Sequence, residues 1–178
     1  ADATAPEISG FALDLNRRLM TLNFDEPVDT TTLQYTSIAL QSAQTEGSRV
    51  NLTGGDVVRS LDGMQIVIQL LDVDVHLITQ DEHLAVNTSS SNLVVAYGAI
   101  ADMATNFINA VSTSNAIVAG YYTDDITNPE LVSFSLDMNI GVMLLTFNET
   151  MDISKLNFTS FTLQTASTAN ALASHRLT

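Results

Sequence analysis

Apolar and polar residues alternate in short stretches along much of this chain, which is the period expected of half-buried β-strands. In residues 19–24 every second position is apolar, and residues 8–15 alternate in the same way. The polar segment 14–17 between these stretches is typical of a turn. The pattern therefore predicts a β-hairpin, which ends at Pro27 because proline cannot donate to a strand ladder.

Further short apolar segments predict the other strands of the first part of the chain. Turn signals separate them, and the pair Asp62-Gly63 is typical of a tight hairpin. The predicted strands cover residues 38–40, 50–52, 57–58, 65–71, 93–97 and 116–121. Residues 72–84 depart from this pattern and predict one helix, with an apolar face. The residues of that face are Val73, Leu77, Ile78 and Leu84.

Composition supports a fold made of strands. β-Branched residues are abundant, and Lys, a common residue of helix surfaces, occurs once, at Lys155. Seven to nine short strands in about 120 residues are typical of a β-sandwich. The predicted fold class is therefore all-β, with an Ig-like β-sandwich as the architecture.

An internal repeat is the strongest signal in the sequence. Residues 6–43 align without gaps to residues 129–166, and 17 of 38 positions are identical. The period is about 123 residues, which is a usual size for a domain. The sequence therefore predicts a complete Ig-like unit over residues 1–128 and the N-terminal part of a second, incomplete unit over residues 129–178.

The second unit is predicted to contain only part of a sandwich, so its apolar face would lie open to water. Its last residues, 176–178, resemble residues 51–53 if two residues are inserted. Two explanations are considered: the chain continues beyond the sequence given, or a neighbouring molecule supplies the missing strands. The first is favoured. The short acidic segment 122–129 is predicted to be a linker.

The charged residues and the lack of cysteine exclude several classes of function. The chain has 20 acidic and 6 basic side chains, a formal net charge of -14 and no cysteine. Nucleic-acid binding is not expected, because phosphate affinity comes from clustered Lys and Arg. Disulfides and thiol chemistry are excluded, and no apolar stretch is long enough to predict a membrane span. The first residues lack the basic and apolar regions of a signal peptide.

Three segments carry a resemblance to a known family. Residues 22–29, 33–40 and 98–106 are similar to motifs of bacterial Ig-like domains of the S-layer and adhesin type, which recur in large surface proteins. The sequence departs from that family at Thr105, where the family usually has Gly, and at Thr150, where the second copy lacks the proline of the first. The resemblance implies an Ig-like fold and an extracellular or cell-surface location. It implies no ligand.

Carboxylates near the predicted turns are candidate calcium ligands, because Ca²⁺ prefers hard oxygen atoms. The preferred pair is Asp124 and Asp125, since a cation in the linker would stiffen the joint between units. The other candidates are Asp14, Asp25, Glu26, Asp29 and Asp102. The competing interpretation, which is favoured, is that these carboxylates are solvated turn residues, because the chain contains no calcium-binding loop motif. No other cofactor is expected.

Two histidines of the predicted helix are candidate zinc ligands. His76 and His83 are seven residues apart and could share a helix face, with Asp72, Asp74, Asp81 and Glu82 as further zinc ligands. Their order matches no zinc motif, so a structural role is preferred. His175 carries no signal. The chain has no nucleophile elbow, P-loop or dinucleotide fingerprint, and an enzymatic function is not expected.

Four N-glycosylation sequons begin at Asn51, Asn87, Asn148 and Asn157. Asn87 is the preferred acceptor, because the polar run 87–92 is expected to be an exposed loop.

Three functions are compared. The preferred one is a structural repeat segment of a large extracellular protein that assembles into a filament, sheath or surface layer. Its partners would be copies of itself, neighbouring repeats and glycans. The alternatives are an adhesin-type module that recognises a glycan or host protein through loops at 43–49 and 85–92, and an accessory domain of a secreted hydrolase.

Overall fold

The structure, a computed structural model, describes residues 2–149, 151–167 and 173–177. It divides into two compact units, Ala1–Thr127 and Asn128–Thr178, here named unit 1 and unit 2. Strands are the main regular structure of the described residues, with one α-helix, which confirms the all-β expectation in general terms. The predicted departure from the family at Thr150 lies outside the described residues.

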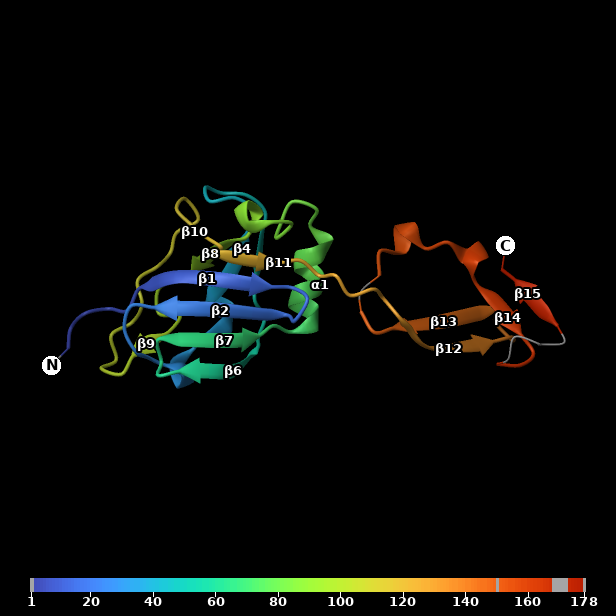
Figure 1. Cartoon of the computed structure of the whole chain (residues 1–178), viewed down its shortest axis with the longest axis horizontal. Helices are drawn as coiled ribbons and strands as arrows, with labels where there is room; N and C mark the ends of the chain where they lie inside the picture. Colours follow the sequence, from blue (N-terminus) through green and yellow to red (C-terminus); the bar gives the residue numbers. More distant parts are fainter. Residues whose placement is uncertain (1, 150, 168–172, 178) are drawn as a thin grey trace. The chain divides into compact units, whose positions relative to one another are not determined.

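Five strands of unit 1 form one sheet, in the order β11-β1-β2-β7-β6 (Figure 1). In chain order they are β1 (Ile8–Asp14), β2 (Leu19–Phe24), β6 (Asp56–Leu61), β7 (Gln65–Gln69) and β11 (Tyr121–Thr123). Neighbouring strands are antiparallel, except that β1 and β11 are parallel. The two predicted hairpins, β1–β2 and β6–β7, are therefore confirmed.

Local turn chemistry explains both hairpins. In the first, Asp14 accepts the backbone N–H of Arg17 through Oδ1 at 2.9 Å. In the second, Asp62 and Gly63 both have positive φ angles, of 49° and 71°. Two successive positive φ angles match the twist of flanking strands, which is why Asp-Gly pairs favour tight hairpins.

Four strands of unit 1 form a second sheet, in the order β10-β8-β4-β5. In chain order they are β4 (Ile38–Gln41), β5 (Arg49–Asn51), β8 (Asn92–Val95) and β10 (Ile117–Val118). A third, very short pair joins β3 (Val28–Asp29) to β9 (Ala101–Asp102). Unit 1 thus contains eleven strands, more than the seven to nine expected, because several pairings involve segments too short to show alternation in the sequence.

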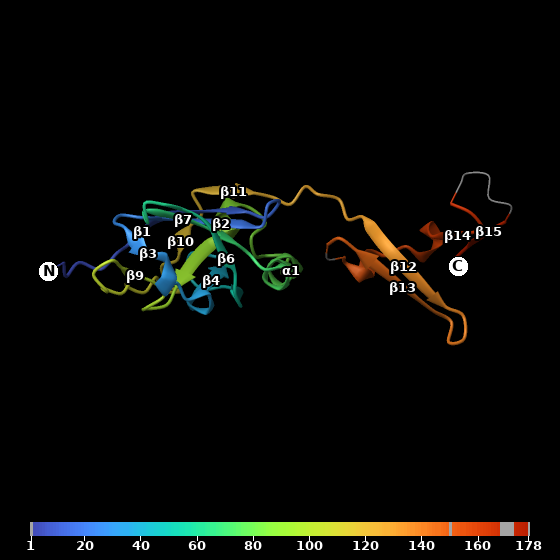
Figure 2. The same cartoon turned by 90° about the horizontal axis from the view of Figure 1, so that it is seen from below.

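The two larger sheets enclose one apolar core. In the view of Figure 2, β1, β2 and β7 form a layer above β4. The inward side chains of both sheets belong to the same buried cluster, which includes Leu13 and Ile66 from the first sheet and Leu40 and Leu93 from the second, all fully buried. Burial of these apolar side chains is the main favourable contribution to the packing of the two sheets.

The helix α1 (Asp72–Gln80) is four residues shorter than predicted, and its buried face differs. Val73 and Leu77, expected to face the core, are 51% and 40% exposed. The buried helical residues are Asp74, Val75 and Ile78. The prediction was right for Ile78 and Leu84, which are buried, and wrong for Val73 and Leu77. A buried carboxylate looks like a solvent-facing residue in the sequence, and Asp74 lies inside because its carboxylate accepts the backbone N–H and the hydroxyl of Thr53.

Unit 2 consists of two hairpins among its described residues. The first pairs β12 (Leu131–Asp137) with β13 (Val142–Phe147), and the second pairs β14 (Thr162–Gln164) with β15 (Ser174–Arg176). Each hairpin forms its own two-stranded sheet.

The pairing in unit 2 repeats that of unit 1 residue by residue. Phe11 faces Leu22 in β1–β2, and Phe134 faces Leu145 in β12–β13, each 123 positions later. Both hairpins have a register shift at the same place, between Ile8 and Gly10 and between Leu131 and Ser133.

The second hairpins correspond as well. Leu40 pairs with Val50, and Leu163 pairs with His175. The first strand is shifted by 123 positions and the second by 125, so two residues are inserted between them.

Candidate functional site

Three carboxylates converge at one end of unit 1. Asp2, Glu26 and Asp102 each offer an oxygen atom, and these atoms lie within 4.8 Å of one another. It is the group of three or more potential metal ligands found when residues 2–149, 151–167 and 173–177 are searched. We treat this acidic cluster as the candidate site.

Strand pairing places two of the three residues. Glu26 lies between β2 and β3, and Asp102 is the last residue of β9. Because Val28 pairs with Asp102, the segment that carries Glu26 is brought to the end of β9. Asp102 is 4% exposed, whereas Glu26 is partly exposed.

Two long-range hydrogen bonds hold the segment that carries the third residue, Asp2. Asp25 accepts the backbone N–H of Glu7 through Oδ1 at 2.8 Å, and Glu7 accepts the N–H of Asp25 through its carbonyl oxygen. These bonds hold the N-terminal segment against the end of β2. Asp2, which is exposed, lies in that segment and accepts the N–H of Thr4 at 3.0 Å.

The carboxylate of Asp102 is largely engaged in its own loop. Its Oδ1 accepts the N–H groups of Ala104 and Asn106, at 2.8 and 2.7 Å, and its Oδ2 accepts from Nδ2 of Asn106 at 2.8 Å. Burial would raise the pKa of Asp102, but these hydrogen bonds outweigh it and hold the pKa below its usual value. Asp102 is therefore charged, and it shapes the turn that follows β9.

The pKa of Glu26 is shifted in the opposite direction. Burial, and then the negative charges of Asp2, Asp102 and Asp25, raise the pKa of Glu26. One of its carboxyl oxygens is shielded from solvent and has no hydrogen-bond partner in the described part of the chain. A hard cation is the kind of group that such a set of oxygens can accept, although Asp102 has little acceptor capacity left.

The calcium candidates taken from the sequence are distributed differently. Glu26 and Asp102 belong to the cluster. Asp14 instead accepts a backbone N–H within its own turn, and Asp25 accepts the N–H of Glu7 from the N-terminal segment. Asp29 caps the short 3-10 helix at Thr30–Thr32, where hydrogen bonds from Thr31 lower its pKa. Calcium binding at these three carboxylates stays a prediction.

The preferred pair in the linker is also bound locally. Asp124 accepts the N–H of Asp125 at 2.9 Å, and Asp125 accepts the N–H of Thr127 at 3.0 Å. The hydroxyl of Tyr122 donates to the carbonyl oxygen of Ala85 at 2.6 Å. Burial and the nearby charge of Asp124 raise the pKa of this tyrosine.

Asp2 was missed in the sequence, although a signal for it existed. The repeat offset of 123 that aligns Pro6 with Pro129 also aligns Asp2 with Asp125. Because Asp125 is a candidate calcium ligand, the repeat makes its equivalent Asp2 a candidate as well. Its proximity to Asp102, however, depends on long-range contacts such as the hydrogen bonds between Glu7 and Asp25, which no local pattern reveals.

The two histidines considered for zinc do not gather a ligand set. His76 lies in α1, where its Nε2 is 2.9 Å from Nε2 of Gln80. His83 is exposed and lies 3.7 Å from Asp81. Neither belongs to the group of three or more potential ligands found among the described residues. His175 is exposed on β15.

The sequon asparagines differ in their surroundings. Asn51, Asn87, Asn148 and Asn157 are all exposed. Asn87 and Asn157 each cap a short 3-10 helix through the side-chain oxygen. The oxygen of Asn148 accepts the N–H of Glu130, and Thr150, which completes its sequon, lies outside the described residues. Glycosylation at these four positions stays a prediction.

The run 87–92 is not an exposed loop throughout. Ser91 and Asn92 are fully buried. The side-chain amide of Asn92 donates to the carbonyl oxygens of Gln41 and Ser89, at 3.1 and 2.9 Å. The expectation of a uniformly exposed loop was wrong here, because these hydrogen bonds satisfy the Nδ2 group of Asn92 inside the protein, while its buried Oδ1 has no partner among the described residues.

Comparison with known proteins gives few matches. No family model matches the sequence, and no match to a curated protein was found. A crystal structure of the S-layer protein rSbsC(31-844) matches 75% of this chain, with 18% identity and a TM-score of 0.44. A structure of surface layer protein SbsC, domains 1-6, matches 81%, with 14% identity and a TM-score of 0.44.

These matches cover 16% and 18% of the length of the two S-layer chains. Identity and TM-score are both low, so the function is inferred from the chain's own repeat and fold. No helix in the described part of the chain combines the length and the apolar character that crossing a membrane requires.

Proposed function

We propose that this chain is a structural segment of a large extracellular or cell-surface protein, built from tandem Ig-like β-sandwich repeats of about 123 residues, which assembles into a filament, sheath or surface layer. The observation that carries this proposal is the shared register of β1–β2 and β12–β13, including the shift at the same position. Register is set by side-chain pattern and turn geometry together, so its repetition supports a common fold for the two units.

The arrangement of unit 1 supports an Ig-like sandwich. Its two larger sheets have five and four strands, most neighbours are antiparallel, and inward residues of both sheets share one core. Two antiparallel layers around a common apolar core are typical of this architecture. We place the repeats at residues 1–128 and 129–178, with the second one incomplete.

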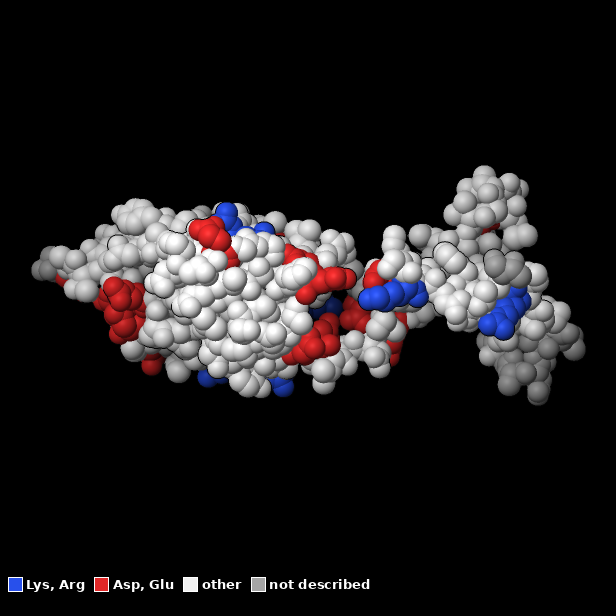
Figure 3. Space-filling model, turned by 90° about the horizontal axis from the view of Figure 1, so that it is seen from above, with Lys and Arg blue, Asp and Glu red and all other residues white. Residues whose placement is uncertain are grey.

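A repeated module of this kind suits a structural role. Tandem units add length with the same contacts each time, and their stability depends mainly on each unit and its neighbours. The chain's net charge of -14 favours solubility and opposes random association. On the face of unit 1 that Figure 3 shows, acidic side chains lie toward the two ends and, beside basic ones, at the upper edge, and the central area is uncharged.

The acidic linker and the acidic cluster bear on how such an array is stiffened. Asp2 and Asp125 occupy equivalent positions before the two units, as Glu26 and Glu149 do after their second strands. We propose that calcium, if the assembly uses it, binds at Asp124 and Asp125 in the linker. Assembly would otherwise depend on contacts between copies of the chain and on glycans. No catalytic role is proposed.

Electron microscopy of the native material, with and without EDTA, tests this function. Ordered filaments or lattices are expected, and their loss in EDTA would support the calcium site in the linker. Separate flexible beads that EDTA leaves unchanged would contradict the assembly role and favour an adhesin stalk.

A further inference from the structure

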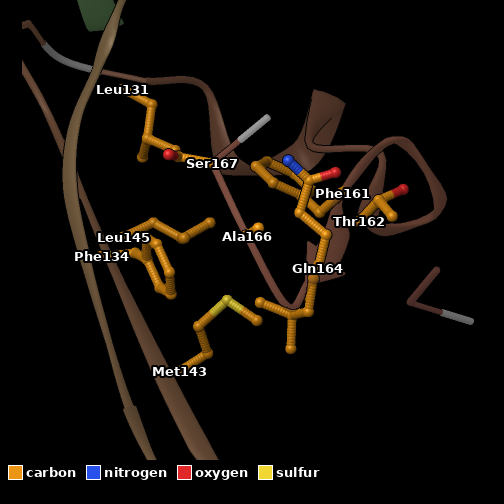
Figure 4. Close-up of a pocket in the computed structure, with 10 residues that line it drawn as sticks. Leu131, Phe134, Met143, Leu145, Phe161, Thr162, Gln164, Ala166 and Ser167 are labelled. Atoms are coloured by element: carbon orange, nitrogen blue, oxygen red, sulfur yellow. The ribbon is translucent and has the colours of Figure 1, made fainter. Parts of the chain in front are cut away.

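The hairpins of unit 2 leave an apolar surface uncovered. This surface, here named the open face, is lined by Leu131, Phe134, Met143, Leu145, Phe161 and Leu163. It borders a hollow of about 370 Å³. Figure 4 shows the side chains of Phe134, Met143 and Phe161 directed toward that hollow.

The same positions are interior in unit 1. Phe134 is 57% exposed, whereas its counterpart Phe11 is 2% exposed. On the same strand, Leu136 is 41% exposed and its counterpart Leu13 is fully buried. Local structure is equal in the two units, so the difference comes from what covers the hairpin.

In unit 1, strand β7 and other residues that follow position 53 pack on the equivalent hairpin. Strand β7 pairs antiparallel with β2, so that Ile68 lies opposite Met20 and Ile66 lies opposite Leu22. Both isoleucines are fully buried. More than half of the buried core of unit 1 comes from residues that follow position 53, for which unit 2 has no counterpart in this chain.

The strand edges of unit 2 are open in the same places. Strand β2 lies between β1 and β7, and β1 lies between β11 and β2. In the described part of unit 2, β12 and β13 pair with each other alone. Such edges expose rows of unpaired N–H and C=O groups, which accept an added strand readily.

We infer that the open face of unit 2 is a strand-acceptor surface, closed by a segment of the same type as residues 54–123 that is joined to β15. The β7 equivalent of that segment pairs antiparallel with β13 and places its two apolar side chains opposite Met143 and Leu145. This inference rests on the proposal that unit 2 has the fold of unit 1.

The path of the chain favours a joined segment over a separate molecule. In unit 1, Leu52 donates to the carbonyl oxygen of Ile38 at 2.9 Å, and β6 begins a few residues later, at Asp56. In unit 2, Leu177 donates to the carbonyl oxygen of Phe161 at 3.0 Å. Leu177 thus makes the hydrogen bond after β15 that Leu52 makes after β5. A separate molecule would also lose translational and rotational freedom on binding, which a joined segment does not.

A fusion of a second copy of residues 54–123 to the C-terminus of the full chain tests the inference. Amide hydrogen exchange, read by mass spectrometry, separates β13 from β2 because their sequences differ. Protection of Val142–Phe147 is expected to rise roughly 100-fold or more, toward that of β2 in the same sample. The control fusion carries Ile66→Asp and Ile68→Asp in the added copy alone, and β13 should stay unprotected in it.

If the fused chain aggregates, a peptide of residues 54–71 added to the unextended chain tests the same pairing, and protection of β13 is again expected. Unchanged exchange at β13 in both experiments would overturn the inference. So would a dimer of the unextended chain in sedimentation with β13 already protected, because a second copy would then be the occupant. Neither result depends on filaments being seen by microscopy, so this inference and the proposed function can fail separately.

Discussion

Thr105 is the position where this chain departs from the Gly of the family that it resembles. Its φ angle is 72°, in the left-handed region that favours glycine. The turn is nevertheless formed, because the N–H of Thr105 donates to the carbonyl oxygen of Asp102 and the Asp102 carboxylate holds Ala104 and Asn106. The contacts of Asp102 thus support a conformation that Thr105 by itself disfavours.

Replacing Thr105 by glycine is expected to stabilise unit 1. Relief of the left-handed strain gains about 1–2 kcal/mol, and the added freedom of the unfolded chain costs about 0.5–1 kcal/mol. Urea unfolding should therefore show a free energy of unfolding higher by about 0.5–1 kcal/mol. Ala104→Gly, the matched control, lacks the positive φ and should destabilise slightly. A loss in Thr105→Gly as large as in the control would contradict the strain argument.

The raised pKa of Glu26 predicts that the stability of unit 1 depends on pH. Its pKa in the folded protein is raised above the ordinary value of 4.5. The stability that it contributes is therefore present below that ordinary value and is lost as pH rises through the raised pKa. Asp102 has a lowered pKa, so its contribution is lost instead as pH falls.

Glu26→Gln should accordingly raise Tm near neutral pH and have little effect in acid. The measurement is Tm for both proteins at a series of pH values between about 4 and 8. The difference between the two proteins isolates Glu26, because the contribution of Asp102 is common to both. Glu82→Gln removes an equal charge from an exposed residue outside the cluster, and the same pH-dependent gain there would refute the assignment.

Among the secondary-structure elements, the hairpins follow their local patterns, whereas the helix follows its pattern only in part. Alternation and turn residues predicted β1–β2 and β6–β7, because both signals come from residues close in sequence. The orientation of α1 depends on Asp74 and its bonds to Thr53, 21 residues away. A periodicity argument treats an aspartate as solvent-facing, so it could not find this contact.

Asp74→Ala is expected to destabilise unit 1 by about 2–3 kcal/mol, since it leaves the N–H of Thr53 without its charged acceptor. Asp72→Ala, on the same helix, removes an exposed ion pair with Arg18, whose atoms lie 2.5 Å apart, and should cost under about 1 kcal/mol. Urea unfolding of the two variants measures the difference. Equal losses would show that Asp74 does not anchor the helix.

At the level of the complete chain, equivalent residues of the two units differ in their surroundings. Leu13 and Leu136 occupy the same position in the two hairpins, yet one is buried and the other is 41% exposed. Leu13→Ala should therefore cost about 2–5 kcal/mol in urea unfolding, and Leu136→Ala under about 1 kcal/mol. A large loss in Leu136→Ala would mean that a cover already packs on unit 2 in solution.

The sequence by itself determined the all-β class, the hairpins β1–β2 and β6–β7 with their turns, and the alignment of residues 6–43 with residues 129–166. These features depend on periodicity, turn chemistry and self-similarity, which are properties of neighbouring residues or of direct comparison. The calcium candidates taken from the sequence also included two of the three carboxylates of the candidate site, Glu26 and Asp102.

The tertiary structure alone decided the order of the strands, the parallel pairing of β1 with β11 and the meeting of Asp2, Glu26 and Asp102. It also decided that Asn92 and Asp74 are buried and that Phe134 is not. Each of these outcomes joins segments that are distant in the chain. The free energy that brings them together comes from core packing and long-range pairing, which local sequence patterns do not encode.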